Sequence, residues 1–317
     1  MTRIKEITVR ASKSFRPSRK EKKRPVWMEK PNVLVQVLKS VALGVSVLLV
    51  IIPFWSIIAT SLADRQTLDQ SAGGMVLWPG DATLSAYASI LSGGVVTRAL
   101  IISIGITVAG TALSLAATAG LAYWLSRRGA FGAKPILLLV LGSLLFSPGL
   151  IPSYLLVKEL NLLDSWWSLI LPVLVNAFNV IVMRAFFQEL PQELFDSAYI
   201  DGASSFTILT RIVLPVSKAV FAVIGLFYAV AYWNAFFNAL LYIQSTDKWP
   251  MALVLRTFVV NQTTIAGDQV GASAEALPPQ LQLQMAILVV SLIPILLVYP
   301  FLQRHFARGV MIGAVKG

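Results

Sequence analysis

The chain has 317 residues, of which 56% are hydrophobic and only 13% are charged. Soluble domains usually carry about 25% charged residues, so these proportions argue against a compact soluble enzyme. The sequence has no cysteine and one histidine, His305, which excludes disulfides, thiolate nucleophiles and multi-histidine metal sites. The composition therefore indicates an integral membrane protein.

Residues 1–32 form a basic tail of different composition. Lysine and arginine dominate it, and its acidic residues are Glu6, Glu21 and Glu29. Such a segment has too little apolar surface to offset the entropy of ordering, so we expect it to be mobile. We expect it to attract anionic membrane lipid and not nucleic acid, because it contains no recognisable nucleic-acid-binding module.

Six apolar stretches follow, and each is long enough to cross about 30 Å of hydrocarbon as a helix. They run over Val33–Leu62, Ala99–Leu125, Pro135–Leu156, Trp166–Phe187, Ala219–Ile243 and Leu281–Phe301. The first is too long for a cleaved signal sequence, and we expect it to be retained. The predicted fold class is all-α: a polytopic membrane bundle of six transmembrane helices over residues 33–303, followed by a tail at 304–317.

The charges of the connecting segments predict the orientation. If the N-terminus is cytoplasmic, the basic tail, the Arg127–Lys134 loop, the Arg211–Lys218 loop and the C-terminal tail all lie inside. The opposite side then carries more acidic than basic residues. Because lysine and arginine accumulate on the cytoplasmic side of membrane proteins, both termini are predicted to be cytoplasmic.

The segment 188–217 is too polar to span a membrane and carries the signals of two short helices. Pro191 suits the first position of a helix, and Gly202 can end that helix because glycine adopts a left-handed conformation at little cost. Ser204 or Ser205 can cap a second helix, and Pro215 closes the segment. We predict a helix–turn–helix elbow, which by pattern alone could dock in a groove of another protein or rest on lipid headgroups.

Seven residues of this elbow keep a distinctive spacing. They are Asp196, Ser197, Ala198, Gly202, Ile212, Leu214 and Pro215. The pattern resembles the "EAA" signature of ATP-binding-cassette (ABC) importer permeases, which reads E-A-A, three residues, G, nine residues, I, one residue, L-P. Aspartate and serine replace the glutamate and the first alanine. In that family this loop is the coupling helix that contacts a cytoplasmic ATPase.

The resemblance extends over the chain after the basic tail. The ending Arg304–Gly317 is similar to that of carbohydrate-uptake permeases of the maltose-permease type. The Trp78-Pro79 loop and the Val310–Gly317 ending resemble a subgroup associated with complex oligosaccharides such as alginate. The resemblance implies the type I ABC importer permease fold in a bacterial cytoplasmic membrane.

The resemblance also implies partners. These are a second homologous permease, two cytoplasmic ABC ATPases, an extracellular or periplasmic solute-binding protein and a saccharide substrate. The chain has no Gly-rich phosphate loop, so we expect a non-catalytic subunit that binds no cofactor, with ATP and Mg on the partner ATPases. The tail residues Arg308, Gly313 and Lys316 are expected to contact an ATPase, with a frayed terminus as the alternative.

Polar residues inside the predicted spans indicate a substrate path, because they are costly against lipid and usually face a bundle interior. The candidates are Asn176, Asn179, Tyr232, Trp233, Asn234 and Asn238. Each asparagine pair, 176 with 179 and 234 with 238, is spaced to share one helix face. Amides can hydrogen-bond sugar hydroxyls and aromatic rings can stack on sugars, but hydrogen bonding between helices is the alternative.

Two outer segments are candidates for contact with the binding protein. The segment 244–280 is long and polar without clear secondary structure, and such loops are commonly functional. A disordered connector is the alternative. The segment Asp64–Asp81 is a second docking candidate.

Two other classes of function remain open. One is a secondary transporter or channel acting without an ATPase, although the predicted spans contain no Asp or Glu for ion coupling. The other is a membrane enzyme or assembly scaffold, for which catalytic side chains are scarce.

Overall fold

The computed structural model describes residues 32–71, 73–127, 129–265 and 277–314, with side chains described up to residue 300. The described residues form helices and connecting turns, without a β-strand among them. The all-α prediction is therefore confirmed. The basic tail up to residue 31 and Lys316 lie outside the described residues.

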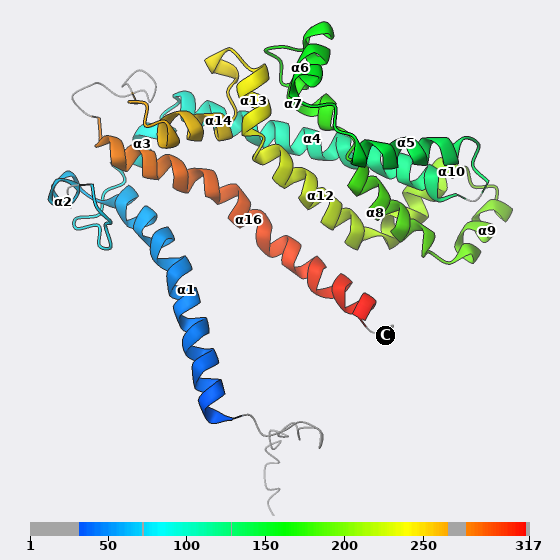
Figure 1. Cartoon of the computed structure of the whole chain (residues 1–317), viewed down its shortest axis with the longest axis horizontal. Coiled ribbons are helices and arrows are strands. Elements are labelled where there is room, and N and C mark those ends of the chain that lie inside the picture. Colours follow the sequence, from blue (N-terminus) through cyan, green and yellow to red (C-terminus); the bar gives the residue numbers. More distant parts are fainter. Residues whose placement is uncertain (1–31, 72, 128, 266–276, 315–317) are drawn as a thin grey trace, which may run out of the picture. The chain divides into compact units, whose positions relative to one another are not determined.

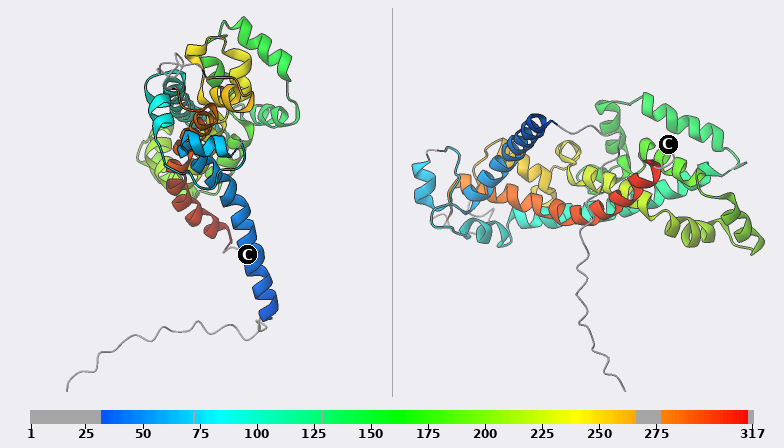
Figure 2. Two further views of the ribbon diagram at one scale, coloured as in Figure 1. Left: turned by 90° about the vertical axis from the view of Figure 1, so that its left-hand side faces the viewer. Right: turned by 90° about the horizontal axis from the view of Figure 1, so that it is seen from below.

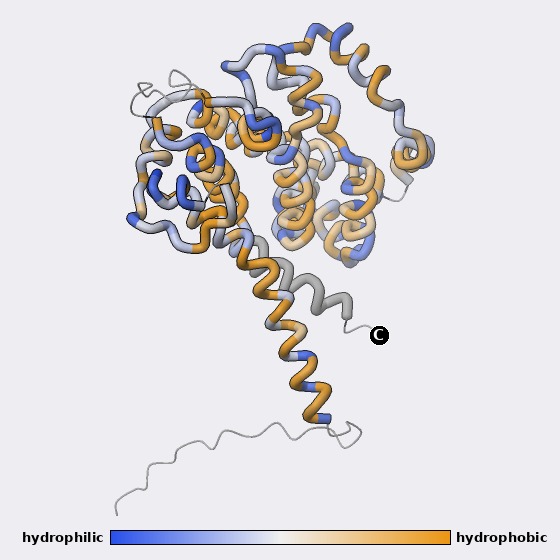
Figure 3. The backbone as a smooth tube through the Cα atoms, turned by 60° about the vertical axis from the view of Figure 1, so that its left-hand side comes forward, coloured by the Kyte–Doolittle hydropathy of each residue, from blue (hydrophilic) through white to orange (hydrophobic). Residues whose placement is uncertain are grey.

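The chain divides into two compact units, Met1–Ile51 and Ile52–Gly317. The helix α1 (Val33–Leu62) crosses this boundary and contains Pro53 directly after it. Its side chains from Val33 to Trp55 are exposed and almost all apolar, as the orange tube in Figure 3 shows. An all-round apolar helix of this length is typical of a membrane span.

Three further helices organise the second unit. They are α4 (Val95–Ser126), α12 (Lys218–Trp233) and α16 (Gln280–Ala314). The helix α12 packs against both α4 and α16, and α8 (Ala177–Gln188) packs against another part of α4 (Figure 1). The largest cluster of buried apolar side chains lies between α4, α8 and α12.

Two tyrosines of α12 pack against glycine and hydroxyl residues of α4. The Ser114 hydroxyl lies 2.7 Å from the Tyr232 hydroxyl, and the Thr118 hydroxyl lies 2.6 Å from the Tyr228 hydroxyl. Gly110 lies under the Tyr232 ring, where an added Cβ would be 2.8 Å from ring carbons. Because lipid supplies no hydrophobic drive for helices to associate, such close packing and hydrogen bonding hold the two helices together.

Only part of the six-span prediction appears as single helices. Within the described residues, three helices are long and apolar enough to span alone: α1, α4 and the Gln280–Pro300 part of α16. Two bent helix pairs pass the same test of length and hydropathy when each pair is taken together. The first joins α7 (Trp167–Ile170) and η1 (Leu171–Val173) to α8 at 52°, and the second joins Ser205–Val216 to α12 at 89°.

The predicted span Pro135–Leu156 is also interrupted. It divides into α5 (Ala133–Leu145) and α6 (Leu150–Glu159), with Pro148 in the break and Gly149 at a φ of +83°. The predicted span Ala219–Ile243 divides into α12 and α13 (Phe236–Tyr242). Continuous hydropathy detects an apolar segment, but it does not detect a break in the backbone inside it.

The expectation that 244–280 lacks clear structure is wrong for its first half. This half forms η3 (Thr246–Lys248), α14 (Met251–Leu255) and η4 (Arg256–Val260). Met251, Val254 and Phe258 are buried in a second apolar cluster with residues of α16 and of α3 (Ser85–Leu91). These apolar residues recur every three to four positions, as expected for a helix buried on one face. The predicted docking segment Asp64–Asp81 likewise contains a short helix, α2 (Arg65–Gln70), capped by the Asp64 carboxylate.

The C-terminal segment is helical over most of its length, although it contains several glycines. The helix α16 continues to Ala314 and therefore includes Arg308 and Gly313. A helix that is already formed gains one backbone hydrogen bond for each added residue, and this offsets the cost of about 1 kcal/mol for a glycine.

The α4–α12 contact predicts a difference between two glycines of α4. Gly110→Ala should destabilise the fold by about 1–3 kcal/mol, because its methyl group would overlap the Tyr232 ring. Gly105→Ala is the matched control, since nothing lies within 4 Å of its added Cβ. The measurement is the unfolding free energy of the purified chain in mixed micelles. Equal effects of the two substitutions would contradict this packing.

Candidate coupling and translocation sites

The predicted elbow is present and begins with α9 (Gln192–Ile200), which follows Pro191 directly. Gly202 has a φ of +74°, and its N–H donates to the Tyr199 carbonyl at 3.0 Å. The Ala203 N–H donates to the Ala198 carbonyl at 2.9 Å. This pair of hydrogen bonds is a Schellman motif, so the prediction that Gly202 ends the helix is confirmed.

The second arm of the elbow leads into α12. Ser204 caps α10 (Ser205–Ile208) by accepting from the Thr207 N–H at 3.2 Å, as predicted. The chain then forms a π-helical turn, η2 (Leu209–Val213), which contains Ile212, and α11 (Leu214–Val216), which contains Pro215. Proline cannot donate the hydrogen bond of a regular helix, which accounts for the irregular turn before it. The 89° bend to α12 follows.

The elbow has one side fixed to the bundle and one side exposed. Phe195 and Ala198 are each 5% exposed and belong to the main buried cluster. Asp196 and Ser197 are exposed, as are the apolar side chains of Ile200 at 86% and Phe206 at 74%. Ala198 belongs to the predicted coupling signature, but its side chain is not on the exposed side of the elbow. It instead faces the core of its own chain, because the helix turns that side toward the bundle.

Arg127, at the end of α4, fastens the elbow to the bundle. Its guanidinium donates to the hydroxyl of Tyr123, at 3.2 Å, and to the hydroxyl of Tyr199. It also lies 4.9 Å from the ring centroids of both Phe195 and Tyr199, which is a favourable cation–π distance. From the sequence, Arg127 indicates only the orientation of the chain in the membrane. Phe195 and Tyr199 are four positions apart and can share one face of α9, but this spacing does not identify their cationic partner.

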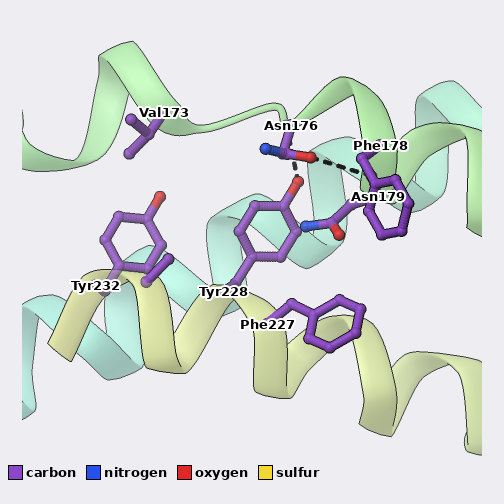
Figure 4. A pocket seen from close by; sticks show the side chains of 8 residues that line it. Val173, Asn176, Phe178, Asn179, Phe227, Tyr228 and Tyr232 are labelled. Carbon is purple, nitrogen blue, oxygen red and sulfur yellow. Dashed lines mark hydrogen bonds between the residues drawn. The ribbon is translucent and has the colours of Figure 1, made fainter. Parts of the chain in front are cut away.

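A second candidate site lies where the α7–α8 span is broken (Figure 4). Asn176 caps α8, and its side-chain oxygen accepts from the Asn179 N–H at 3.1 Å. The Asn176 N–H donates to the Tyr228 hydroxyl at 3.0 Å. This interrupted backbone borders a pocket of about 480 Å³, whose lining includes Asn176, Asn179, Phe227, Tyr228 and Tyr232.

Asn179 is a pocket residue with unused hydrogen-bonding capacity. Its residue is 4% exposed, and its side-chain amide makes no hydrogen bond with the described part of the chain. The Tyr232 hydroxyl, by contrast, is engaged with Ser114 and lies 3.4 Å from the Ile170 carbonyl. The amide of Asn179 is therefore available to a ligand, whereas Tyr232 contributes mainly its ring.

The remaining predicted path residues lie elsewhere. Trp233 and Asn234 line a different and largely apolar hollow of about 650 Å³ between α4, α12 and α16. Asn238 is in α13 and borders neither pocket. The prediction that Asn234 and Asn238 share one helix face is wrong, because α12 ends at Trp233 and α13 starts at Phe236.

An ion pair joins two segments that are far apart in the sequence. The Lys248 ammonium lies 2.7 Å from the Asp164 carboxylate, and the same carboxylate accepts from Ser245 and Gln244. The Asp164 N–H donates to the Tyr242 carbonyl at 2.7 Å. These contacts tie the loop after α6 to the segment after α13. The hydrogen bonds from Lys248 and Ser245 hold the pKa of the Asp164 carboxyl well below its usual range.

We predict that this ion pair stabilises the folded chain by an amount that does not change with pH over most of the acidic range. The pKa is lower in the folded chain than in the unfolded one, so the carboxylate stabilises the fold above pH 3.8 and this contribution is lost only as the pH falls below that value. Asp164→Asn should remove the contribution at pH 7 while tolerating the φ of +57°. Glu159→Gln, on the exposed end of α6, is the control. Thermal unfolding between pH 4 and pH 7 measures both, and indistinguishable variants would exclude the contribution.

Comparison with known proteins identifies the family. The family model described as "binding-protein-dependent transport system inner membrane component" matches residues 130–312. The chain belongs to this family. The match includes the whole elbow and both of the helices α8 and α12 that form the pocket. The predicted resemblance to ABC importer permeases is confirmed.

Individual relatives agree with this assignment. The chain is 43% identical over 270 residues to the polygalacturonan/rhamnogalacturonan transport system permease protein YtcP of Bacillus subtilis, covering 85% of this chain and 94% of that protein. It is 47% identical over 271 residues to protein LplC of the same organism, covering 84% of this chain and 90% of LplC.

A solved structure agrees as well. A chain of a bacterial ABC transporter involved in the import of the acidic polysaccharide alginate matches with a TM-score of 0.80 and 27% identity. The match covers 88% of this chain and 100% of that one. The type I ABC importer permease fold predicted from the sequence is thereby confirmed.

Proposed function

We propose that this chain is a permease subunit of an ATP-driven saccharide importer, and that partner ATPases move it between states open to opposite sides of the membrane. The partners are a second homologous permease, two cytoplasmic ABC ATPases that hold ATP and Mg, and an external solute-binding protein. The family assignment supports a binding-protein-dependent transporter. The relatives named for polygalacturonan, rhamnogalacturonan and alginate support a saccharide, in particular an oligosaccharide.

The observation that carries the proposal is the two-sided elbow. Its inner side is bound to α4 through Arg127, and Phe195 of this side is part of the buried cluster. Its outer side presents the apolar residues Ile200 and Phe206. Exposed apolar groups on a short rigid helix suit docking into a groove of another protein. A force on α9 would pass through the turn at Gly202 to α12, and through Arg127 to α4.

The membrane orientation follows from the same proposal. The elbow faces the cytoplasm, where ATP is available, and both termini lie on that side. The tail residues Arg308, Gly313 and Lys316 are proposed to contact an ATPase. The segments 64–81 and 244–280 then lie outside, toward the binding protein.

The turn at Gly202 provides a test that separates backbone conformation from contacts. No atom of the described residues lies within 4 Å of a Cβ added at Gly202, so within this part of the chain a substitution acts only through its φ of +74°. Gly202→Val should strain this turn by about 1–2 kcal/mol and uncouple binding-protein-stimulated ATP hydrolysis from uptake. Gly202→Asn is the matched control, because asparagine tolerates the left-handed region. The readouts are ATPase stimulation and uptake by the reconstituted complex. Normal coupling in the valine variant would refute the role of the elbow.

The pocket at Asn179 provides an independent test of the substrate path. Asn179→Leu keeps the side-chain volume and removes the free amide, so it should raise the substrate concentration needed for half-maximal uptake by about tenfold, equivalent to one hydrogen bond of about 1.4 kcal/mol. Asn234→Leu is the control, since the Asn234 amide bonds to the Val230 carbonyl of its own helix. An unchanged uptake curve for the Asn179 variant would exclude this pocket from the path.

The alternative of a secondary transporter or channel makes a contrary prediction. The purified chain alone, in liposomes and without nucleotide, should then move the saccharide. We expect no uptake until the ATPases, the second permease and the binding protein are added. Uptake by the chain alone would overturn the proposed function.

A further inference from the structure

A pocket of about 470 Å³ lies where α4 ends, α5 begins and α8 ends. Its lining includes three cationic side chains, Arg127, Lys134 and Arg184, together with the polar residues Ser126 and Gln188. None of the described residues that line it carries a carboxylate. The pocket is separate from the Asn176–Tyr228 site, with which it shares no residue.

The three cations lack anionic partners. Across the residues that the structure describes, the single ion pair joins Lys248 to Asp164, so no described carboxylate lies within 4.0 Å of these cations. Like charges that converge on one concave site raise its potential and favour capture of an anion. The proposed coupling role of the elbow uses Arg127, but it does not require Lys134 or Arg184.

Two of the cations are already held in place. The Arg184 Nε donates to the Leu125 carbonyl at 3.0 Å, and Arg127 is fixed by Tyr123 and Tyr199. Lys134 is exposed and has no hydrogen bond or ion pair with the described chain. A flexible ammonium beside two fixed guanidinium groups is suited to bind a phosphate group, because a phosphate accepts several charge-assisted hydrogen bonds.

The backbone adds to the same charge. The 13-residue helix α5 begins after Gly132, which has a φ of +71° and offers no side chain to cap the first N–H groups. The positive end of this helix therefore reaches the pocket without a competing side-chain acceptor.

We propose that this pocket binds a phosphate group carried by an anionic phospholipid. The apolar helices α4 and α5 meet at the pocket, which places it at the level of lipid headgroups. Next to it, Leu138 and Leu139 of α5 are 68% and 72% exposed and provide an apolar surface for acyl chains. A soluble phosphate would use the cations alone, whereas a phospholipid uses both surfaces. The site does not depend on the identity of the transported substrate.

Lipid binding to the full-length chain in nonionic detergent tests this site by native mass spectrometry. Phosphatidylglycerol should bind more tightly than zwitterionic phosphatidylcholine. Lys134→Gln should weaken phosphatidylglycerol binding about fivefold, and the double variant Lys134→Gln, Arg184→Gln about 25-fold, at roughly fivefold per cation. Lys134→Arg keeps the charge and should retain the affinity. Excess inorganic phosphate should not displace the lipid.

Arg211→Gln is the matched control, because Arg211 is an exposed cation outside the pocket. Lys134 is exposed as well, so its replacement does not disturb a buried contact. Equal losses for Lys134→Gln and Arg211→Gln would mean a general charge effect and would overturn the site. An unchanged affinity in Lys134→Gln would also overturn it. Displacement of the lipid by inorganic phosphate would reject a phospholipid as the source of the phosphate group.

Discussion

The hydroxyl contacts between α4 and α12 determine how the second unit is built. Inside a membrane, burial of apolar surface does not favour helix association, so helices associate where their backbones approach closely and their polar groups meet. The Tyr228 hydroxyl lies beside Thr118 of α4 and also accepts from the Asn176 N–H at the start of α8. One side chain thus connects three helices. The span breaks at Asn176 beside the pocket, and the Tyr228 hydroxyl satisfies the Asn176 N–H there.

The two ends of α4 have different attachments (Figure 2). Near its start, the Ser103 hydroxyl accepts from the Met251 N–H at 2.7 Å, which joins it to α14 and to the second apolar cluster. After its last turn, Arg127 is bound to Tyr199 of the elbow. The regions at the two ends are therefore connected by one uninterrupted helix, while the helices packed on it, α7–α8 and α10–α12, are bent. Rigid and bent elements combined in this way suit a protein that changes shape as a set of linked bodies.

Local chemistry made some of these features predictable. Gly202, Ser204 and Pro215 act through their own backbone or a neighbour within five residues, and the elbow was predicted from them. The separation of Asn234 from Asn238 could not be predicted in the same way. The backbone break at Asn234–Ala235 lies inside a continuous apolar run. The buried helix α14 was hidden in a segment whose ends are polar. Arg127 and the Asp164–Lys248 pair act on residues 72 and 84 positions away, and no local pattern predicts such contacts.

The continuity of α4 has a geometric consequence. From Ser103 to Arg127 the helix rises about 36 Å, at about 1.5 Å per residue, which is enough to cross the hydrocarbon layer. A tilt of about 10° around the Ser103 end would therefore carry the Arg127 end sideways by about 6 Å, or roughly one helical turn. Because α4 is long and uninterrupted, a small rotation at one membrane surface becomes a displacement as large as a side chain at the other surface.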